Sequence, residues 1–156
     1  MNNRSAIIVG AGILGMATAR ALALKGFKVK VIERSQFSIG ASIRNFGMLW
    51  PIGQPDGQLY ERAIRSREIW EEYLNAGSIP FNSCGSLHLA YSKEEWDVLE
   101  ELSHIFWEKG RPVNLINSGQ IADRFDGINQ NNLKGGLYST DEVIIDPREG
   151  IRNLPL

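Results

Sequence analysis

The 156-residue sequence lacks most of the features that mark a protein for a special environment or partner. Cys84 is its only cysteine, which excludes an intramolecular disulfide and a zinc cluster built on cysteines. No apolar run approaches the roughly 20 residues of a membrane-spanning helix. The net charge is only −1 at pH 7, and lysine and arginine are scattered, so nothing favours binding to nucleic acid or a membrane surface.

Patterns of hydrolytic or metal chemistry are missing as well. His88 has no neighbours at the spacing of metal ligands or of a base and its partner, and His104 falls on the polar side of its expected helix, beside Asp97, Glu101 and Glu108, where exposure to solvent is expected. No Ser-His-Asp arrangement, carboxylate pair or internal repeat stands out. The first expected strand begins within a few residues of Met1, which leaves no room for a signal or transit peptide. We therefore expect a cytoplasmic protein without a metal site.

The most informative feature that is present is a glycine-rich turn near the start of the chain. Residues 6–9 form a short apolar run typical of a strand in a parallel sheet. Gly10, Gly12 and Gly15 follow with the G-x-G-x-x-G spacing, and a helix is predicted over residues 13–25. The first glycine permits the tight turn, the second lets the backbone approach a pyrophosphate, and the third lets helix and strand pack closely.

The residues after this turn complete a nucleotide-binding pattern. The helix opens at Ile13 and Leu14, and the N–H groups at its positive end would face the phosphates. Gly26 ends the helix, residues 28–32 give a second strand, and Glu33 stands at the carboxyl end of that strand. An acid at roughly this 20-residue distance accepts hydrogen bonds from the ribose hydroxyls and disfavours NADP. A dinucleotide is therefore expected on this motif, and a purely structural turn is the weaker alternative.

Downstream, helix and strand signals alternate without another nucleotide-binding repeat. Residues 35–53 are rich in Ser, Gly and Asn and are expected to line a ligand, with a short helix starting near Ser42. Asp56 is expected to cap a helix to about residue 75, and Ser118 to open a short helix to residue 125. The other predicted elements are strands at 79–83 and 86–91 paired with each other, a helix at 92–109 opened by a Ser92–Glu95 capping box, strands at 113–116, 137–139 and 143–145, and a final helix begun by Asp146 and Pro147.

The pattern also indicates an incomplete chain. Only two parallel strands are identifiable, too few for a stable doubly wound sheet. Ile151 and Leu154 begin an apolar stripe on the final helix, and the sequence stops at Leu156. A fragment of a longer protein explains this better than the alternative, a short terminal helix ended by Pro155.

Several segments carry a resemblance to a known family. They include Ile-Ile-Val-Gly-Ala-Gly-Ile-Leu-Gly at 7–15, Val-Ile-Glu-Arg at 31–34, Gly-Ala-Ser-Ile-Arg-Asn-Phe-Gly-Met-Leu at 40–49, Cys-Gly-Ser-Leu-His-Leu-Ala at 84–90 and Ile-Asp-Pro-Arg at 145–148. In this order they resemble the amino-terminal part of the D-amino-acid-oxidase-like FAD-dependent oxidoreductases, the group of glycine oxidase and sarcosine oxidase. Within the family, residues 44–51 and 54–57 look most like a subgroup proposed to oxidise aminophosphonates.

The resemblance implies a fold and a domain organisation. The fold would be α/β, with a Rossmann-like FAD-binding βαβ unit followed by the start of an α+β substrate domain with a mixed or antiparallel sheet. Residues 1–76 would be the N-terminal part of the FAD-binding domain, and residues 77–156 an incomplete substrate-binding domain. Family members are more than twice as long and return to the FAD domain with a second glycine-rich flavin contact.

The resemblance also implies roles for individual residues. FAD would be the cofactor, with its pyrophosphate at the glycine turn and its ribose at Glu33. Further cofactor contacts are implied for Ile13, Leu14, Arg34 and Ser42, and the flavin ring would lie along Arg44, Asn45, Gly47, Met48 and Leu49. A solvated charge explains Arg34 equally well, and a helix cap explains Ser42 in the same way. Arg44 could pair with a carboxylate or phosphonate of the substrate, or with a cofactor phosphate or structural carboxylate.

The implied activity is oxidation of the C–N bond of a small amine, either an aminophosphonate or an amino acid, by hydride transfer to flavin N5. This amine is the only expected partner, with no nucleic acid and no membrane. Two alternatives stay open: a catalytically incompetent nucleotide-binding fragment and an NAD-dependent dehydrogenase. The second is disfavoured because residues 35–53 do not continue as a nucleotide-binding repeat.

Overall fold

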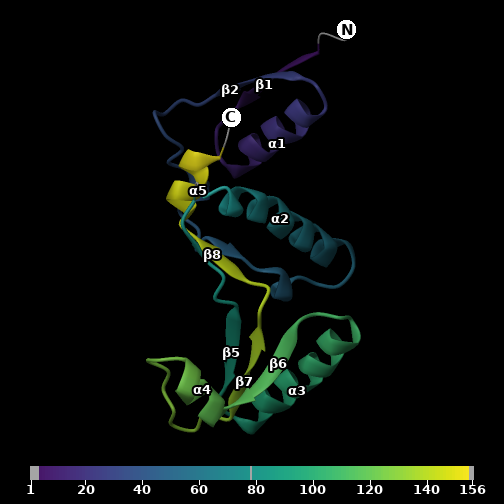
Figure 1. Ribbon diagram of the computed structural model, residues 1–156, viewed down its shortest axis with the longest axis vertical. Helices are drawn as coiled ribbons and strands as arrows, with labels where there is room; N and C mark the ends of the chain where they lie inside the picture. The colour runs from purple at the N-terminus through teal and green to yellow at the C-terminus, as the bar shows by residue number, and fades with distance from the viewer. Residues whose placement is uncertain (1–3, 78, 155–156) are drawn as a thin grey trace. The chain divides into compact units, whose positions relative to one another are not determined.

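The computed structural model describes residues 4–77 and 79–154, and its elements belong to two compact units (Figure 1). Unit 1 comprises Met1–Met48, Ser66–Asn82 and Ile144–Leu156, and unit 2 comprises Leu49–Arg65 and Ser83–Val143. The chain therefore passes between the units more than once. The units are defined by packing alone, so the expected functional boundary between residues 76 and 77 stays a prediction.

Unit 1 begins with a strand–helix–strand arrangement. β1 (Ser5–Val9) and β2 (Lys28–Ile32) are parallel and paired along their whole lengths. α1 (Ile13–Leu24) connects them, as a parallel pair requires a crossover of this kind. The strand–turn–helix–strand order predicted from the sequence is confirmed nearly residue by residue, because apolar runs and glycines encode it locally.

One face of this two-stranded sheet is open among the described residues. The register places Ile7 opposite Lys30 and Val9 opposite Ile32, so their side chains share a face. Ile7 is 66% exposed and Val9 is 85% exposed. Parallel sheets are normally covered on both faces. The open face therefore leaves the apolar side chains of Ile7, Val9 and Ile32 exposed beside Lys30.

A second small sheet has the order β3–β8–β4, formed by Met48–Leu49, Val143–Ile145 and Phe81–Asn82. β4 runs antiparallel to β8. The predicted pairing of residues 79–83 with residues 86–91 is wrong, because the first segment pairs with β8 and the second joins another sheet. Both segments find their partner strands much later in the chain, which no local signal reveals.

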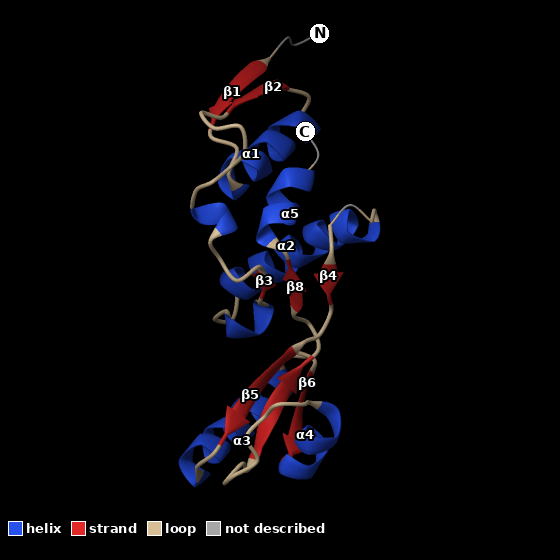
Figure 2. Cartoon of the chain, turned by 90° about the vertical axis from the view of Figure 1, so that its left-hand side faces the viewer, coloured by secondary structure: helices blue, strands red, loops and turns tan. Residues whose placement is uncertain are grey.

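Unit 2 is built on a three-stranded antiparallel sheet with the order β5–β7–β6. Figure 2 shows the strands of this sheet in red, with β5 and β6 labelled. Its strands are Ser86–Ala90, Gly135–Ser139 and Val113–Asn117. The neighbours Leu137 and Tyr138 point to opposite faces, and each belongs to a separate apolar cluster. One cluster includes Ile52, Ala90, Leu99 and Val113 with residues of α3 (Lys93–Glu108), and the other includes Ile116, Ile121 and Leu133 with α4 (Ser118–Arg124). The α/β class with mixed sheets is confirmed.

The helices follow the expected caps with two exceptions. The Ser92–Glu95 capping box at α3 is present, and Asp146 accepts hydrogen bonds from the first N–H groups of the last helix. Asp56 lies two positions before the first residue of the next helix, so it is not the N-cap residue, and its carboxylate pairs with the cations of Lys109 and Arg111. The remaining elements are η1 (Ala41–Ile43), η2 (Pro51–Gly53), α2 (Gln58–Asn75) and α5 (Pro147–Asn153).

The second exception is at α4, where the expected opening by Ser118 is wrong by one residue. Asn117 is the N-cap, and its side chain and that of Gln120 form a reciprocal capping box. We expect Asn117→Ala to lower the free energy of unfolding by about 1 kcal/mol, since it removes the acceptor for a helix N–H. Ser118→Ala should change it by less than about 0.5 kcal/mol. Urea titration followed by circular dichroism tests both, and equal losses would contradict the assignment.

Candidate functional site

The glycine turn in unit 1 has the geometry of a phosphate-binding loop. Gly10 follows β1 with φ of +103°, in the left-handed region that favours glycine, and its N–H donates to the carbonyl of Ile32 at 2.7 Å. A Cβ on Gly15 would lie 2.0 Å from the carbonyl oxygen of Gly10. Only glycine at position 15 therefore lets α1 pack this close to the end of β1.

Ser42 reaches the start of α1 from a loop twenty-nine residues away in sequence. Its Oγ accepts the N–H of Ile13 at 3.0 Å, and a Cβ on Gly12 would lie only 2.9 Å from the same oxygen. The hydroxyl therefore occupies the region that the unpaired N–H groups of a helix N-terminus offer to an anion. Ser42 thus accepts a hydrogen bond from the first residue of α1, although Ser42 itself lies in the short helix η1.

A cavity of about 410 Å³ opens over this turn. It brings together most of the predicted phosphate-side residues, and its lining includes Gly10, Gly12, Ile13, Leu14, Gly15, Ser42 and Asn45. The backbone is extended at Gly12, the N-cap of α1. The glycines, the N–H groups at the start of α1 and the hydroxyl of Ser42 in this lining suit a pyrophosphate, because they offer hydrogen-bond donors to it.

Glu33 braces the turn from the end of β2. Its Oε2 accepts the N–H of Ala11 at 2.8 Å, and its Oε1 accepts the N–H of Ser35 at 3.2 Å. The Ala11 bond, followed by the Ser35 bond, lowers the pKa of Glu33 below its ordinary value. The charged carboxylate keeps free lone pairs on both oxygens, which ribose hydroxyls can use.

A second cavity, of about 560 Å³, is lined in part by Glu33. Its lining includes Ala11 and Glu33 together with Phe37, Arg148 and Arg152. The guanidinium of Arg152 stands 5.2 Å from the ring centre of Phe37. The sequence did not point to these three residues. Phe37 lies shortly after Glu33 in the sequence, so a motif search could have found it. Arg148 and Arg152 lie in α5 and approach Glu33 only in the tertiary structure.

The lowered pKa of Glu33 gives a prediction of pH dependence. The two bonds to the carboxylate stabilise the turn at any pH above its ordinary pKa of 4.5, and they are lost as the pH falls through the lower value of the folded state. We expect the wild-type turn to persist below pH 4.5. Glu33→Gln should bind FAD several-fold more weakly at neutral pH and should lack the acidic transition. NMR of the Ala11 amide during an acid titration measures the loss of its hydrogen bond to Glu33. An identical transition in the Glu33→Gln variant would contradict the prediction.

The loop expected beside the flavin is braced by Asn45. Its Nδ2 donates to the carbonyl of Ser42 and its Oδ1 accepts the N–H of Gly47, both at 2.7 Å. Gly47 is buried with φ of +66°, and a Cβ there would lie 1.9 Å from the carbonyl of Ile145. Met48 and Leu49 form β3. The loop therefore has a defined shape set by its polar side chain and its glycine.

Five predicted site residues line neither cavity: Arg34, Arg44, Gly47, Met48 and Leu49. Arg34 and Arg44 are exposed. The roles suggested for all five stay predictions. Within residues 4–77 and 79–154, no group of three metal-ligating side chains is found, and no helix is long and apolar enough to cross a membrane.

Comparison with known proteins agrees with this geometry. L-2-hydroxyglutarate dehydrogenase of Dictyostelium discoideum is 31% identical over 91% of the chain, and glycerol 3-phosphate dehydrogenase of Caloramator mitchellensis is 28% identical over 91%. The chain spans only 33% and 30% of these two relatives. It is about a third of their length.

The fold is also that of several solved structures. Glycine oxidase from Geobacillus kaustophilus superposes with a TM-score of 0.82 at 24% identity, over 96% of this chain and 42% of that one. L-α-glycerophosphate oxidase from Mycoplasma pneumoniae, solved with FAD bound, gives 0.79 at 22% identity, over 99% of this chain and 42% of that one. The DAO family, described as FAD dependent oxidoreductase, matches residues 5–154. The chain therefore belongs to the DAO family of oxidoreductases, whose cofactor is FAD.

Proposed function

We propose that the chain is the FAD-binding portion, with part of the substrate portion, of an oxidoreductase that oxidises the C–N bond of a small amine. The observation that carries the proposal is the phosphate cavity at the glycine turn with Glu33 beside it. Glycine oxidase and L-proline dehydrogenase, both named for amine-bearing compounds, share the fold. Residues 44–51 favour an aminophosphonate or an amino acid as the substrate.

In this proposal, different residues of the chain bind the parts of FAD and the substrate. FAD, when bound, supplies a hydride acceptor at its flavin N5. The turn at Gly10–Gly15 and Glu33 hold the pyrophosphate and the ribose, and Asn45 keeps the following loop in shape. Arg44 is an exposed cation in that loop, and its planar guanidinium suits a carboxylate or phosphonate.

We also propose that a longer polypeptide completes the FAD-binding unit. Two observations support this: the open apolar face at Ile7 and Val9, and the share of about a third that the chain covers in its relatives. Reading the gene past the codon of Leu156 tests the idea. A continuing frame with another glycine-rich segment is the expected result, and a stop codon with no complementary polypeptide would contradict it.

The activity itself is tested by anaerobic bleaching of the flavin absorbance. The protein, loaded with FAD, is mixed with glycine, sarcosine or 2-aminoethylphosphonate, and with L-2-hydroxyglutarate or glycerol 3-phosphate as competing probes. We expect bleaching by at least one amine and none by the hydroxy compounds. Bleaching by a hydroxy compound alone would replace the C–N assignment by C–O oxidation, as in the relatives of those names.

The two alternatives predict different results in the same experiment. A catalytically incompetent fragment would bind FAD without bleaching by any probe, and an NAD-dependent dehydrogenase would retain NAD in preference to FAD. The proposal includes no nucleic-acid or membrane partner, and it places the protein in the cytoplasm. A small amine is its only proposed partner.

A further inference from the structure

The sequence contains two Asp-Gly pairs, Asp56–Gly57 and Asp126–Gly127. In such a pair the backbone nitrogen of the glycine can attack the carboxyl carbon of the aspartate, because glycine has no Cβ to hinder the approach. The new N–C bond closes a five-membered succinimide ring, while the hydroxyl of the carboxyl group and the hydrogen of the nitrogen leave as water. A water molecule then opens the ring at either carbonyl. The product is either aspartate again or isoaspartate, whose main chain is longer by one methylene group.

The two pairs in this protein are alike in exposure and in glycine conformation. Asp56, Gly57, Asp126 and Gly127 are all exposed to solvent. The angle φ is +81° at Gly57 and +79° at Gly127, in the region that favours glycine. Neither the access of water nor the conformation of the glycine therefore distinguishes the two pairs.

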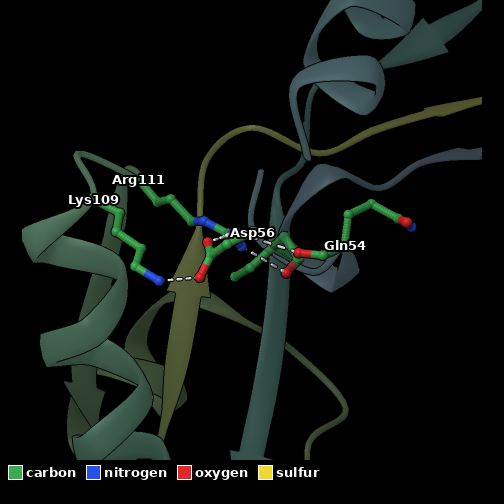
Figure 3. A network of polar contacts seen from close by, with 5 residues as sticks. Gln54, Asp56, Lys109 and Arg111 are labelled. Carbon is green, nitrogen blue, oxygen red and sulfur yellow. Dashed lines mark hydrogen bonds and ion pairs between the residues drawn. The ribbon is translucent and has the colours of Figure 1, made fainter. Parts of the chain in front are cut away.

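The carboxylate of Asp56, by contrast, is bound by two cations. It pairs with Lys109 and with Arg111, as Figure 3 shows. The side chain of Arg111 is only 3% exposed, and its guanidinium also donates to the carbonyls of Ile52 and Gln54, both at 3.3 Å. The hydrogen bond from Lys109 is the largest cause of the lowered pKa of Asp56. Ring closure requires a carboxyl group that is free to turn and carries a proton, so the ion pairs and the lowered pKa both oppose it.

The backbone around Asp56 is also held by the first turn of α2. The carbonyl of Pro55 accepts the N–H of Tyr60 at 3.2 Å, and the carbonyl of Gly57 accepts the N–H of Glu61 at 3.0 Å. These bonds lie on either side of Asp56. They restrict the rotation of the backbone that would bring the glycine nitrogen to the carboxyl carbon.

The second pair has no such restraint. Asp126 directly follows Phe125, the C-cap of α4, whose N–H donates to the carbonyl of Ile121 at 2.9 Å. Within residues 4–77 and 79–154, the carboxylate of Asp126 has no hydrogen bond or ion pair, and the N–H of Gly127 has no acceptor. The two groups that must react are therefore both free of other partners.

We infer that Asp126–Gly127 is a site of spontaneous modification, at which aspartate converts to isoaspartate, and that the ion pairs of Asp56 protect the other Asp-Gly pair from the same reaction. The only co-reactant is water, which the first step releases and the second consumes. The inference does not depend on the proposed function, since no flavin or substrate takes part.

The modification would act on the packing of unit 2. Phe125 and Ile128 flank the pair, and both pack against the apolar cluster that contains Ile121. The ring of Phe125 also contacts that of Tyr138, with centroids 5.8 Å apart. An added methylene lengthens the backbone between Phe125 and Ile128, so the two side chains cannot both keep their packed positions. This part of unit 2 should therefore loosen as the protein ages.

Peptide mapping of the aged protein tests the inference. The full chain is kept at neutral pH and physiological temperature for several weeks and then digested with trypsin, which places the two pairs on separate peptides, residues 45–62 and 125–134. Isoaspartate is separated by chromatography and identified by electron-transfer fragmentation, with a fresh sample as the zero point. We expect it to form at residue 126 about tenfold or more faster than at residue 56, where two charge-assisted bonds oppose the reaction.

Two variants separate the chemistry from the protection. Asp126→Glu keeps the charge, but its longer side chain would have to close a six-membered ring, which forms far more slowly, so the product at position 126 should be lost. Lys109→Gln removes one of the two cations at Asp56, and it should raise the rate at residue 56 several-fold while leaving residue 126 unchanged.

Synthetic peptides of residues 45–62 and 125–134 give the rates without the fold, and these should be similar. If the 125–134 peptide isomerises and residue 126 of the folded protein does not, the modification site is overturned. Equal rates at residues 56 and 126 in the folded protein, or no change at residue 56 in Lys109→Gln, would overturn the protection by the ion pairs.

Discussion

Gly15→Ala should weaken FAD binding by roughly 100-fold, which corresponds to about 3 kcal/mol. The added Cβ would lie 2.0 Å from the carbonyl oxygen of Gly10, and a backbone atom cannot move aside as a flexible side chain can. α1 must then separate from the end of β1, which displaces the N–H groups that face the pyrophosphate. Titration followed by flavin fluorescence gives the dissociation constant.

Gly40→Ala is the matched control for this substitution. Gly40 lies in the loop before η1, has φ of −80°, and has open space within 4 Å of an added Cβ. We expect its dissociation constant to stay within about twofold of wild type. An equal loss in both variants would show that the effect is not the contact between Gly15 and Gly10.

Leu137→Ala should lower the free energy of unfolding of unit 2 by about 3–5 kcal/mol. Leu137 is 1% exposed and lies in the central strand β7, with Leu115 on one side and His88 on the other. Truncation leaves a cavity at the centre of the cluster that joins the sheet to α3. Urea unfolding and amide exchange of β6 and β7 measure the loss.

Val98→Ala provides the comparison for the core substitution. Val98 lies in α3 and is 54% exposed, so its side chain gives up little contact. The change should stay within about 0.5 kcal/mol. A loss as large as that of Leu137→Ala would contradict the placement of the core on the β7 side of the helix.

The part of the fold that the sequence predicts well is encoded by neighbouring residues. The glycines at 10, 12 and 15 require special backbone geometry, and the apolar runs beside them have strand length, so β1, α1 and β2 follow directly. The capping box of Ser92 and Glu95 is equally local, since its two bonds join residues three positions apart.

The predictions from sequence are wrong where a strand or side chain binds a partner that is distant in sequence instead of a neighbouring one. Residues 79–83 and 86–91 look like a hairpin, yet each pairs with a strand that appears only near the end of the chain. Asp56 has the character of a helix cap, but Lys109 and Arg111 offer two cations, which bind a carboxylate more strongly than a backbone N–H does. Neither outcome can be obtained from the nearby sequence.

In the candidate site, too, the residues close in sequence were predicted and the distant ones were not. The phosphate cavity gathers the predicted glycines with Ser42, because a single motif and the following loop supply them. The cavity beside Glu33 also needs Arg148 and Arg152, which the fold of unit 1 brings in from α5. The hydrogen bonds that Arg111 and Glu142 make to the backbone of Ile52 could not be predicted for a similar reason, since these residues lie 59 and 90 positions further along the chain.

Amide NMR during titration of the chain with FAD and, separately, with NAD tests whether the glycine turn and Glu33 bind FAD. We expect saturable binding of FAD, with the largest shifts at Gly12, Ile13 and the Ala11 amide bound to Glu33, and weaker binding of NAD. Preferential binding of NAD, or no shift at these amides with either dinucleotide, would contradict it.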